Sequence, residues 1–212
     1  MCCRYYMELS PELRPIIEEA NRAELTEQLV NKLGRPLITE GEVRPTNIVP
    51  VIAPSRAGRR SVFPMVWGFN LQRSSVPLFN ARVETAATKP TFKDSWASRR
   101  CIVPASYYFE WEHLTNPATG KSKTGDKYMI QPAGSAVTWL AGLYRIEEMA
   151  GIQVPVFAIL TREPGYRIRF IHDRMPVILP GEAIEIWIDP KTDPKDVVGM
   201  AVTEVAVEKV GR

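Results

Sequence analysis

From residue 42 onward the chain divides into short apolar segments separated by turn-forming residues, and this pattern constrains the fold more than any other feature. Runs rich in Val, Ile and aromatic residues, bounded by Gly, Pro, Asn and Ser, are typical of β-strands. We expect strands at residues 1–9, 48–53, 61–68, 78–84, 101–111, 128–130, 139–145, 155–161, 175–179 and 202–207. Many strands with few helices predict an α+β fold with a mainly antiparallel, barrel-like β core.

The helical signals are confined to a few peripheral segments. Ser10 is suited to cap a helix, Pro11 to begin one and Gly34 to end one. Apolar residues at helical spacing follow Ser10, and we expect Pro15 to split or delay this helix. Residues 113–127 are polar and rich in Gly, Thr, Asn and Lys, which predicts an exposed hairpin loop. Shorter helices are expected at residues 91–98, 182–187 and 194–200.

The composition predicts one globular domain over residues 1–212, since 45% of the 212 residues are hydrophobic and no linker is visible. A net charge of +3 is compatible with a nucleic-acid-binding patch but is too small to indicate one. Three cysteines, two of them adjacent, do not make a disulfide framework, which favours a reducing compartment. Without a signal peptide or a run of membrane-spanning length, we expect a cytoplasmic protein that does not contact a membrane.

Cys2 follows the initiator Met1, and cysteine is small enough for an aminopeptidase to remove the methionine. Cys2 would then carry an α-amine and a thiol, whose ordinary pKa values are about 7.8 and about 8.5. The amine of such an aminothiol condenses with an aldehyde, and the thiol then closes a thiazolidine ring. The alternative is that Met-Cys stands by chance at a disordered chain end.

Asn80, Arg82 and Glu84 alternate with apolar residues in one expected strand. Residues two apart in a strand share a face, so an amide, a guanidinium and a carboxylate are expected to point the same way. A solvated outer face is the simpler interpretation for a generic strand. Against it, this face carries three different polar groups rather than repeated Lys and Glu.

Two further residues are suited to proton transfer. Glu110 lies between Phe109 and Trp111, and desolvation there would raise its pKa toward the range useful for proton transfer. An edge-strand carboxylate in water is an equally open interpretation. His172 follows an apolar pair and can exchange a proton near neutral pH, although a lone histidine is more often structural. His113 lies in the expected polar loop and is assigned no role.

The patterns of several other site classes are missing from the sequence. Cys2 and Cys3 do not form a CxxC pair, and no His or Cys pair has the spacing of metal ligands. There is no P-loop, no GxGxxG motif and no GxSxG motif. We therefore expect no metal, no cofactor and no conventional hydrolase triad.

Taken together, these segments resemble the SRAP family, the SOS-response-associated peptidase domain. Each motif is short, but all of them follow in order through nearly the whole chain, which makes the signal specific. The matching stretches are Met1-Cys2 with Arg4, and residues 45–50 (PTNIVP), 65–68 (MVWG), 80–85 (NARVET), 99–105 (RRCIVPA), 109–111 (FEW) and 171–176 (IHDRMP).

The resemblance implies that the chain senses abasic sites in single-stranded DNA and forms a covalent thiazolidine crosslink through Cys2 after loss of Met1. The crosslink would shield the lesion during the response to DNA damage. Under this resemblance the catalytic residues are Cys2, Asn80, Glu110 and His172. His172 helps to open the sugar ring, Glu110 moves protons during condensation, and Asn80 positions the Cys2 amine.

The resemblance also implies a set of DNA-binding residues. The guanidinium groups of Arg4, Arg82 and Arg174 would neutralise phosphates, which predicts salt-sensitive binding. Trp67 would stack on a base beside the abasic gap, an interaction worth about 1–3 kcal/mol, and Asn47 would shape the pocket. We expect a monomer whose partner is abasic single-stranded DNA, located in the cytoplasm or at a bacterial nucleoid.

Some positions depart from the family pattern, and two other functions stay open. Cys3 stands where the family usually has Gly, Ser106-Tyr107 replaces Asp-Gly, and residues 69–72 lack the usual Pro and second Trp. An N-terminal-nucleophile peptidase, acting on itself or on other proteins, is one alternative, although no triad supports it. A non-catalytic module for single-stranded or modified DNA is the other, and it would need neither Cys2 nor Glu110.

Overall fold

The computed structural model describes residues 3–71, 74–115, 119–120 and 122–211. A five-stranded barrel forms its centre in the order β12–β4–β3–β8–β11, and β11 also pairs with β12 and closes the ring. Within this ring only the β12–β4 pairing is parallel. The expected α+β fold with a mainly antiparallel barrel-like core is therefore confirmed. The strands are β3 (Ile48–Pro54), β4 (Arg60–Trp67), β8 (Arg100–Ala105), β11 (Thr138–Met149) and β12 (Ile152–Arg162).

The strands β3 and β8 are buried on both faces, which explains why they appear as continuous apolar runs. All six residues of β8 are buried, and six of the seven residues of β3 are buried. In the core, the Trp67 ring lies parallel to the Phe157 ring with their centroids 6.1 Å apart, and it also contacts the ring of Tyr5 of β1 (Arg4–Met7). All three residues have no exposed surface. This packing makes Trp67 part of the hydrophobic core.

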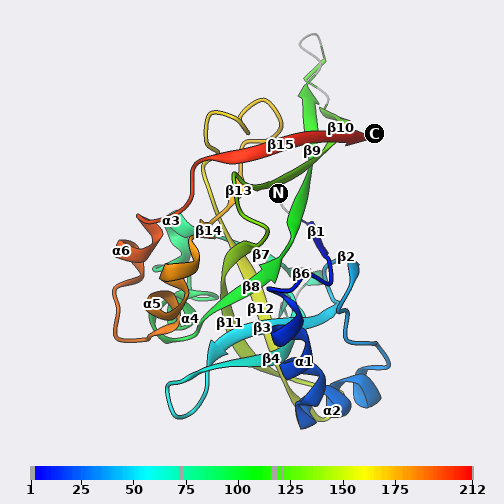
Figure 1. Ribbon diagram of the computed structural model, residues 1–212, viewed down its shortest axis with the longest axis vertical. Helices are drawn as coiled ribbons and strands as arrows, with labels where there is room; N and C mark the ends of the chain where they lie inside the picture. Colours follow the sequence, from blue (N-terminus) through cyan, green and yellow to red (C-terminus); the bar gives the residue numbers. More distant parts are fainter. Residues whose placement is uncertain (1–2, 72–73, 116–118, 121, 212) are drawn as a thin grey trace.

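A second, five-stranded sheet lies beside the barrel and extends beyond it, toward the top of Figure 1. The N-terminal strand sits in its middle, because β1 pairs with β9 on one side and with β2 on the other. Each pairing in this sheet is antiparallel. The order is β15 (Val205–Gly211), β10 (Ser122–Pro132), β9 (Tyr107–Thr115), β1 (Arg4–Met7) and β2 (Gly41–Val43).

Short strands complete the fold. β5 (Phe69–Leu71) and β6 (Ser74–Leu78) form a small hairpin, and β7 (Asn80–Arg82) runs parallel to β12. β13 (Met175–Pro176) pairs with the C-terminal end of β12, and β14 (Ile178–Leu179) pairs with β11. The segments that carry Asn80 and Arg174 are therefore neighbours of the same strand, β12.

The helices are peripheral, as expected. In Figure 1, α1 and α2 lie below the barrel, and α4, α5 and α6 lie on its left side. The first helix starts late, at Arg14 rather than at Pro11, with Pro15 in its first turn, and Gly34 ends α2 in the left-handed conformation with φ +63°. The helices are α1 (Arg14–Arg22), α2 (Glu24–Leu33), α3 (Val83–Ala86), α4 (Lys93–Ser98), the 3-10 helix η1 (Gly181–Ala183), α5 (Ile184–Ile188) and α6 (Pro194–Val198).

Two expectations are corrected. Residues 113–127 do not form one long loop, because β9 continues to Thr115 and β10 begins at Ser122, with a register shift between Thr124 and Lys127. Glu84 does not share a strand face with Asn80 and Arg82, since β7 ends at Arg82 and Glu84 lies in α3. In the first case β9 and β10 pair with each other across polar residues, and in the second β7 ends where its pairing with the distant strand β12 ends.

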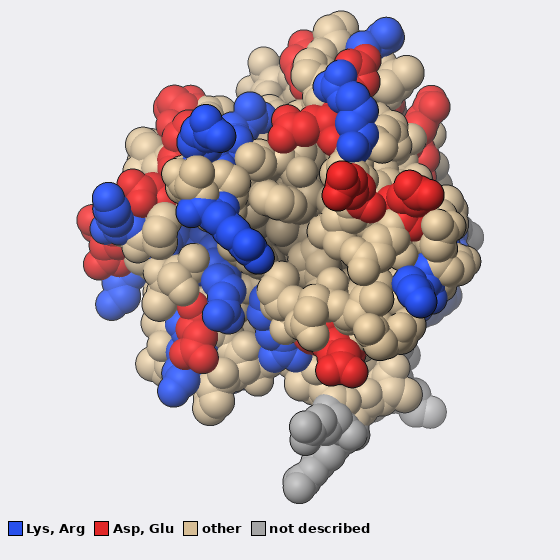
Figure 2. Space-filling view, turned by 90° about the horizontal axis from the view of Figure 1, so that it is seen from below, with Lys and Arg blue, Asp and Glu red and all other residues tan. Residues whose placement is uncertain are grey.

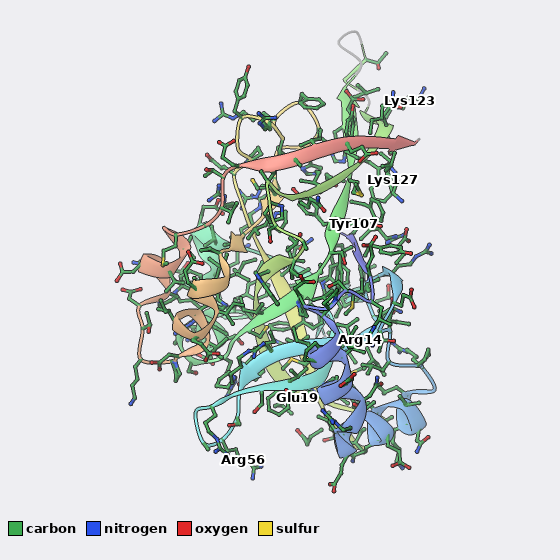
Figure 3. All side chains as sticks on the ribbon, viewed as in Figure 1. Arg14, Glu19, Arg56, Tyr107, Lys123 and Lys127 are labelled. Carbon is green, nitrogen blue, oxygen red and sulfur yellow. The ribbon has the colours of Figure 1, made fainter. Side chains whose placement is uncertain are left out.

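The lower end of the molecule carries no surface of a single charge sign. Figure 2 shows Lys and Arg side chains there interspersed with Asp and Glu. This end therefore offers no uniform basic face for a polyanion. No helix in the described part of the chain has both the length and the apolar character that crossing a membrane requires.

Candidate active site

A small cavity opens where β1 meets β9. Its volume is about 290 Å³, and Cys3, Arg4, Glu110, Trp111, His113 and Thr124 line it. The antiparallel register places Arg4 opposite Phe109, so the N-terminal segment leaves β1 beside Glu110. Cys2, the expected nucleophile, lies outside the described residues. The fold nevertheless brings the residue that follows it into the same cavity as the expected proton-transfer group.

Glu110 is the most strongly perturbed carboxyl of this cavity. Only 2% of the residue is exposed, and desolvation raises the pKa of its side chain to about 7. The backbone N–H of Trp111 donates to its Oε1 at 3.4 Å, a long contact that stabilises the carboxylate only weakly. Glu110 can therefore give up or take a proton close to neutral pH, which agrees with the desolvated one of the two interpretations left open by the sequence.

His172 lies next to the cavity because it contacts His113, which lines the cavity and was not expected to belong to the site. Its ring contacts the ring of His113, with centroids 4.1 Å apart and planes tilted by 54°. The backbone also joins them, because the His113 N–H donates to the carbonyl of Ile171 at 3.0 Å. The segment that carries His172 thus runs along the free edge of β9, beyond the end of β1.

Burial controls the protonation of His172. The residue is 5% exposed, and desolvation lowers the pKa of its imidazole to about 4. Its Nδ1 accepts a hydrogen bond from the backbone N–H of Arg174 at 2.9 Å, which requires an unprotonated Nδ1. The Asp173 carboxylate stands 2.7 Å from the same nitrogen and favours the opposite state, but it is exposed and its effect is smaller than desolvation. The ring is therefore neutral at pH 7.

Arg82 and Arg174 line a second cavity, of about 460 Å³, together with Glu163, Pro164, Arg169 and Asp173. The Arg174 guanidinium is already engaged. It donates to both carboxylate oxygens of Glu84 at 2.8 Å and to the carbonyl of Thr161 at 2.7 Å. The Arg174 hydrogen bonds also lower the pKa of Glu84. Arg174 thus builds the wall of this cavity, whereas Arg82 is exposed at its rim.

Asn80 and Arg4 hold separate positions. Asn80 begins β7 opposite Ile159, half-buried and two residues before Arg82. Arg4 reaches across the sheet to the carboxylate of Glu42, with Nε 3.1 Å from Oε1. Glu42 also meets Arg44 at 2.8 Å and a lysine of β10 at 3.6 Å, so it neutralises only part of the local positive charge. Arg4 therefore adds positive charge at the mouth of the Glu110 cavity.

The structure corrects the role expected for Trp67. The residue has no exposed surface, its ring stacks on Phe157, and its indole N–H donates to the carbonyl of Phe79 at 2.9 Å. A ring with no exposed surface is not accessible to a base of bound DNA. Asn47 lies next to it in a turn, where its side-chain oxygen accepts from the backbone N–H of Arg44 at 2.8 Å.

Several neighbours of the site were missed in the sequence. His113 was placed in a loop, yet Phe109, Trp111 and His113 keep the period of two that marks a continuing strand. Arg169 and Asp173 come from a turn without regular structure, and no local pattern signals their approach to Arg82. Within the described ranges, no group of three or more His, Cys, Asp or Glu side chains could hold a metal ion.

The sequence of this chain is similar to the sequences of known proteins. The model of the family described as SOS response associated peptidase (SRAP) matches residues 1–210. The abasic site processing protein YoaM of Bacillus subtilis is 38% identical over 120 residues, which cover 56% of this chain and only 50% of YoaM. The abasic site processing protein YobE of the same species is 33% identical over 171 residues, 74% of each chain.

Solved structures show the same fold. A crystal structure of a protein from Bacteroides thetaiotaomicron superposes with a TM-score of 0.73 at 20% sequence identity. The superposition covers 99% of this chain and 92% of that chain. The barrel with its flanking second sheet is therefore an arrangement found in other solved proteins.

Proposed function

This chain belongs to the SRAP family, and from its site we propose that it processes abasic sites in DNA. Its relatives YoaM and YobE carry that activity in their names. The observation that carries the proposal is the buried Glu110 carboxyl, which shares a cavity with Cys3 and Arg4 of the N-terminal segment. Such a cavity suits an aldehyde that must meet an amine, a thiol and a proton-transfer group together.

The chemistry we propose is a covalent capture by Cys2. Once Met1 is removed, the Cys2 amine attacks C1′ of the ring-opened deoxyribose, and loss of water gives a Schiff base. The Cys2 thiol then adds to the same carbon, and its proton passes to the nitrogen. The product is a thiazolidine, and the balance is one aldehyde and one aminothiol in, one water out.

Cys3 does not substitute for Cys2 in this scheme. Its nitrogen is part of a peptide bond, so it has a thiol but no free amine. Burial also raises the pKa of the Cys3 thiol, which leaves it protonated and weakly nucleophilic at neutral pH. Cys3 instead forms part of the cavity wall beside Glu110.

Glu110 is the proton carrier in this proposal. A group with a pKa of about 7 is present in both forms at neutral pH. It can take a proton from the attacking amine and return it to the departing hydroxyl, and such catalysis typically contributes about 10²- to 10⁴-fold. His172 is neutral at pH 7 because of burial, so it would act first as a base or hydrogen-bond partner during opening of the sugar.

The DNA partner we propose is a single strand. The cations around the two cavities, Arg4, Arg82 and Arg169, would lie along its phosphates, so the affinity should fall with salt concentration. Asn80, half-buried two residues before Arg82, would orient the Cys2 amine. Asn47 would act by fixing the turn next to the barrel. The protein would work as a cytoplasmic monomer.

The deciding experiment mixes the protein with single-stranded DNA that carries one abasic site and weighs the intact product. We expect an adduct with the mass of the chain without Met1 plus the DNA, less one water, mapped to Cys2. The adduct should form without borohydride, because a thiazolidine is stable whereas a Schiff base must be reduced to survive.

Two variants separate the roles of the adjacent cysteines. Cys2→Ala should abolish the stable adduct while noncovalent DNA binding is kept, and the matched Cys3→Ala variant should still form it. An adduct that survives Cys2→Ala refutes the thiazolidine mechanism. Full DNA binding with no adduct in any variant favours a non-catalytic binding module, and cleavage of a peptide favours the peptidase.

A further inference from the structure

Two exposed aromatic side chains stand on the segment between β12 and β13. Tyr166 is 88% exposed and Phe170 is 57% exposed, whereas Ile168 between them is fully buried. Among the large hydrophobic side chains that are exposed in the described part of the chain, these two are the only aromatic ones. Because Ile168 anchors the segment in the core, both rings are presented on a packed support rather than on a free chain end.

These rings border a groove of about 740 Å³ between the segment and the outer strands of the second sheet. Tyr128 of β10 and Val207 of β15 contribute apolar surface on the sheet side. The Phe170 ring meets the Tyr128 ring edge to face, with centroids 5.6 Å apart and planes at 88°. We call this cavity the Tyr166 groove. Its walls offer flat aromatic faces of the size of a nucleobase.

Three cations border the same groove: Arg167, Arg169 and Lys209. Arg167 approaches Glu204 only at 3.9 Å, and both side chains are mostly exposed, so this pair is weak. Lys209 forms an ion pair with Asp126. Among the described residues, no ion pair involves Arg169. Aromatic faces interleaved with cations favour a ligand that has both π-faces and negative charge, which describes a nucleotide.

Two observations relate the Tyr166 groove to the residues of the candidate site. Tyr128 lies directly opposite Glu110 in the β9–β10 ladder, and residues opposite in an antiparallel pair share a face. Arg169 lines the Tyr166 groove and also the cavity that contains Arg82. The strand partner of Glu110 and a cation beside Arg82 therefore both border the groove, which makes it the candidate subsite for a nucleotide next to the lesion.

We propose that the Tyr166 groove binds an intact nucleotide of the same single strand that flanks the abasic site. Its base stacks on Tyr166 and Phe170, and its phosphate lies against Arg169. An abasic nucleotide has no base to stack, so affinity for the lesion has to come from its neighbours. The inference rests on the proposed function for the position of the lesion, but nucleotide binding in the groove does not depend on the crosslink.

The test uses fluorescence anisotropy with a labelled single strand that contains no abasic site, so that no covalent chemistry occurs. The Tyr166→Ala/Phe170→Ala variant should bind about 5- to 150-fold more weakly than the wild type, the range expected for one lost stacking contact. Tyr166→Ala alone should lose part of this affinity, and Tyr166→Phe should keep it. Ile146→Ala, which removes an exposed apolar side chain on β11, is the matched control and should bind as the wild type.

A second measurement places the groove relative to the lesion. Abasic oligonucleotides are shortened one nucleotide at a time from each end, and the crosslinking rate is measured below saturation. Removal of the flanking nucleotide from one side of the abasic site, but not from the other, should slow crosslinking by the wild type to the rate of the Tyr166→Ala/Phe170→Ala variant. At saturating DNA the two proteins should react at equal rates, because the groove binds the strand and does not take part in the chemistry.

The outcomes separate the two proposals. If the double variant and Tyr166→Ala both bind undamaged single strands as tightly as the wild type, the groove proposal is overturned whether or not a crosslink forms. If their binding is weakened but no protein forms a crosslink, the groove is supported and the capture chemistry fails. Equal slowing by truncation from both ends also contradicts a single flanking subsite.

Discussion

Replacement of Glu110 by Gln should make the protein more stable at high pH while it removes the proton carrier. The ordinary pKa of a glutamate is 4.5, and desolvation raises that of Glu110 to about 7. Between these two values the unfolded chain is ionised and the folded chain is protonated, so folding takes up a proton. Wild-type stability therefore falls as pH rises from about 4.5 to about 7, and the loss is complete above pH 7.

The size of the effect follows from the two pKa values. The difference between about 7 and 4.5 is about 2.5, and at 1.36 kcal/mol for each pH unit the full penalty is about 3.4 kcal/mol. Most of it, about 2.5 kcal/mol, develops between pH 5 and pH 8, because at pH 5 the unfolded glutamate is already largely ionised. Gln has nearly the same shape and carries no charge, so the variant escapes this penalty.

Urea unfolding at pH 5 and pH 8 measures the effect. The stability of Glu110→Gln relative to the wild type should rise by about 2.5 kcal/mol between the two pH values, whatever packing difference exists at pH 5. Glu182→Gln removes an exposed carboxyl and controls for the change in net charge. If the stability difference between Glu110→Gln and wild type is the same at both pH values, the account of a desolvated carboxyl is wrong.

The same variant links stability to function. Crosslinking to abasic single-stranded DNA should slow by about 10²- to 10⁴-fold in Glu110→Gln, because a proton carrier is lost. A variant that is more stable at pH 8 but less active would show that the desolvated carboxyl destabilises the fold and is needed for the reaction. An unchanged rate would remove Glu110 from the mechanism and leave its burial as a structural feature.

Three further predictions concern other buried groups. The wild type should lose stability as pH falls from 6.5 to about 4, because the folded protein holds the His172 ring neutral while the unfolded chain protonates it. His172→Gln should lose less stability over the same pH range in urea unfolding, and an equal loss in both proteins would contradict this account. Arg100→Ala should lower the free energy of unfolding by at least about 3 kcal/mol, because the residue is 1% exposed and its guanidinium donates to carbonyls of α4, α5 and the turn after α5. An unchanged midpoint of urea unfolding would refute that role. Gly68→Ala should lower the free energy of unfolding by about 2 kcal/mol or more, because φ is +123° and the new Cβ would stand 2.8 Å from Cβ of Pro77. Thermal unfolding measures this, and an unchanged stability would show that the β5–β6 hairpin moves aside without cost.

The strand pattern predicted the barrel best where its strands are buried on both faces. Residues 48–53 and 101–105 consist almost entirely of apolar side chains, and the structure buries all of them in β3 and β8. The pattern failed where strands leave the core. Residues 113–115 and 122–127 are polar because they extend beyond the body of the molecule, yet their backbones still pair with each other. Backbone hydrogen bonding does not depend on side-chain polarity, so polarity did not reveal this extension, and the period of two through His113 was its one local signal.

The candidate site shows the same division. The local sequence left open whether Glu110, between two aromatic residues, would be desolvated or would lie in water, and the structure places it at 2% exposure. Trp67 was misjudged, because an aromatic residue at a strand end can face either the core or a ligand. His113 was missed, because its role depends on contact with His172, which lies 59 positions along the chain.

The sequence by itself determined the chemistry available to this protein: a cysteine at position 2, a carboxyl within an aromatic segment, and a histidine followed by an acid and a base. These are properties of residue types and their immediate neighbours. Only the tertiary structure decided which groups act together. The β1–β9 pairing carries the N-terminal segment to Glu110, and the segment before β13 brings His172 to β9 and Tyr166 to the groove. Proximity between distant residues comes from strand pairing and core packing, which local sequence does not encode.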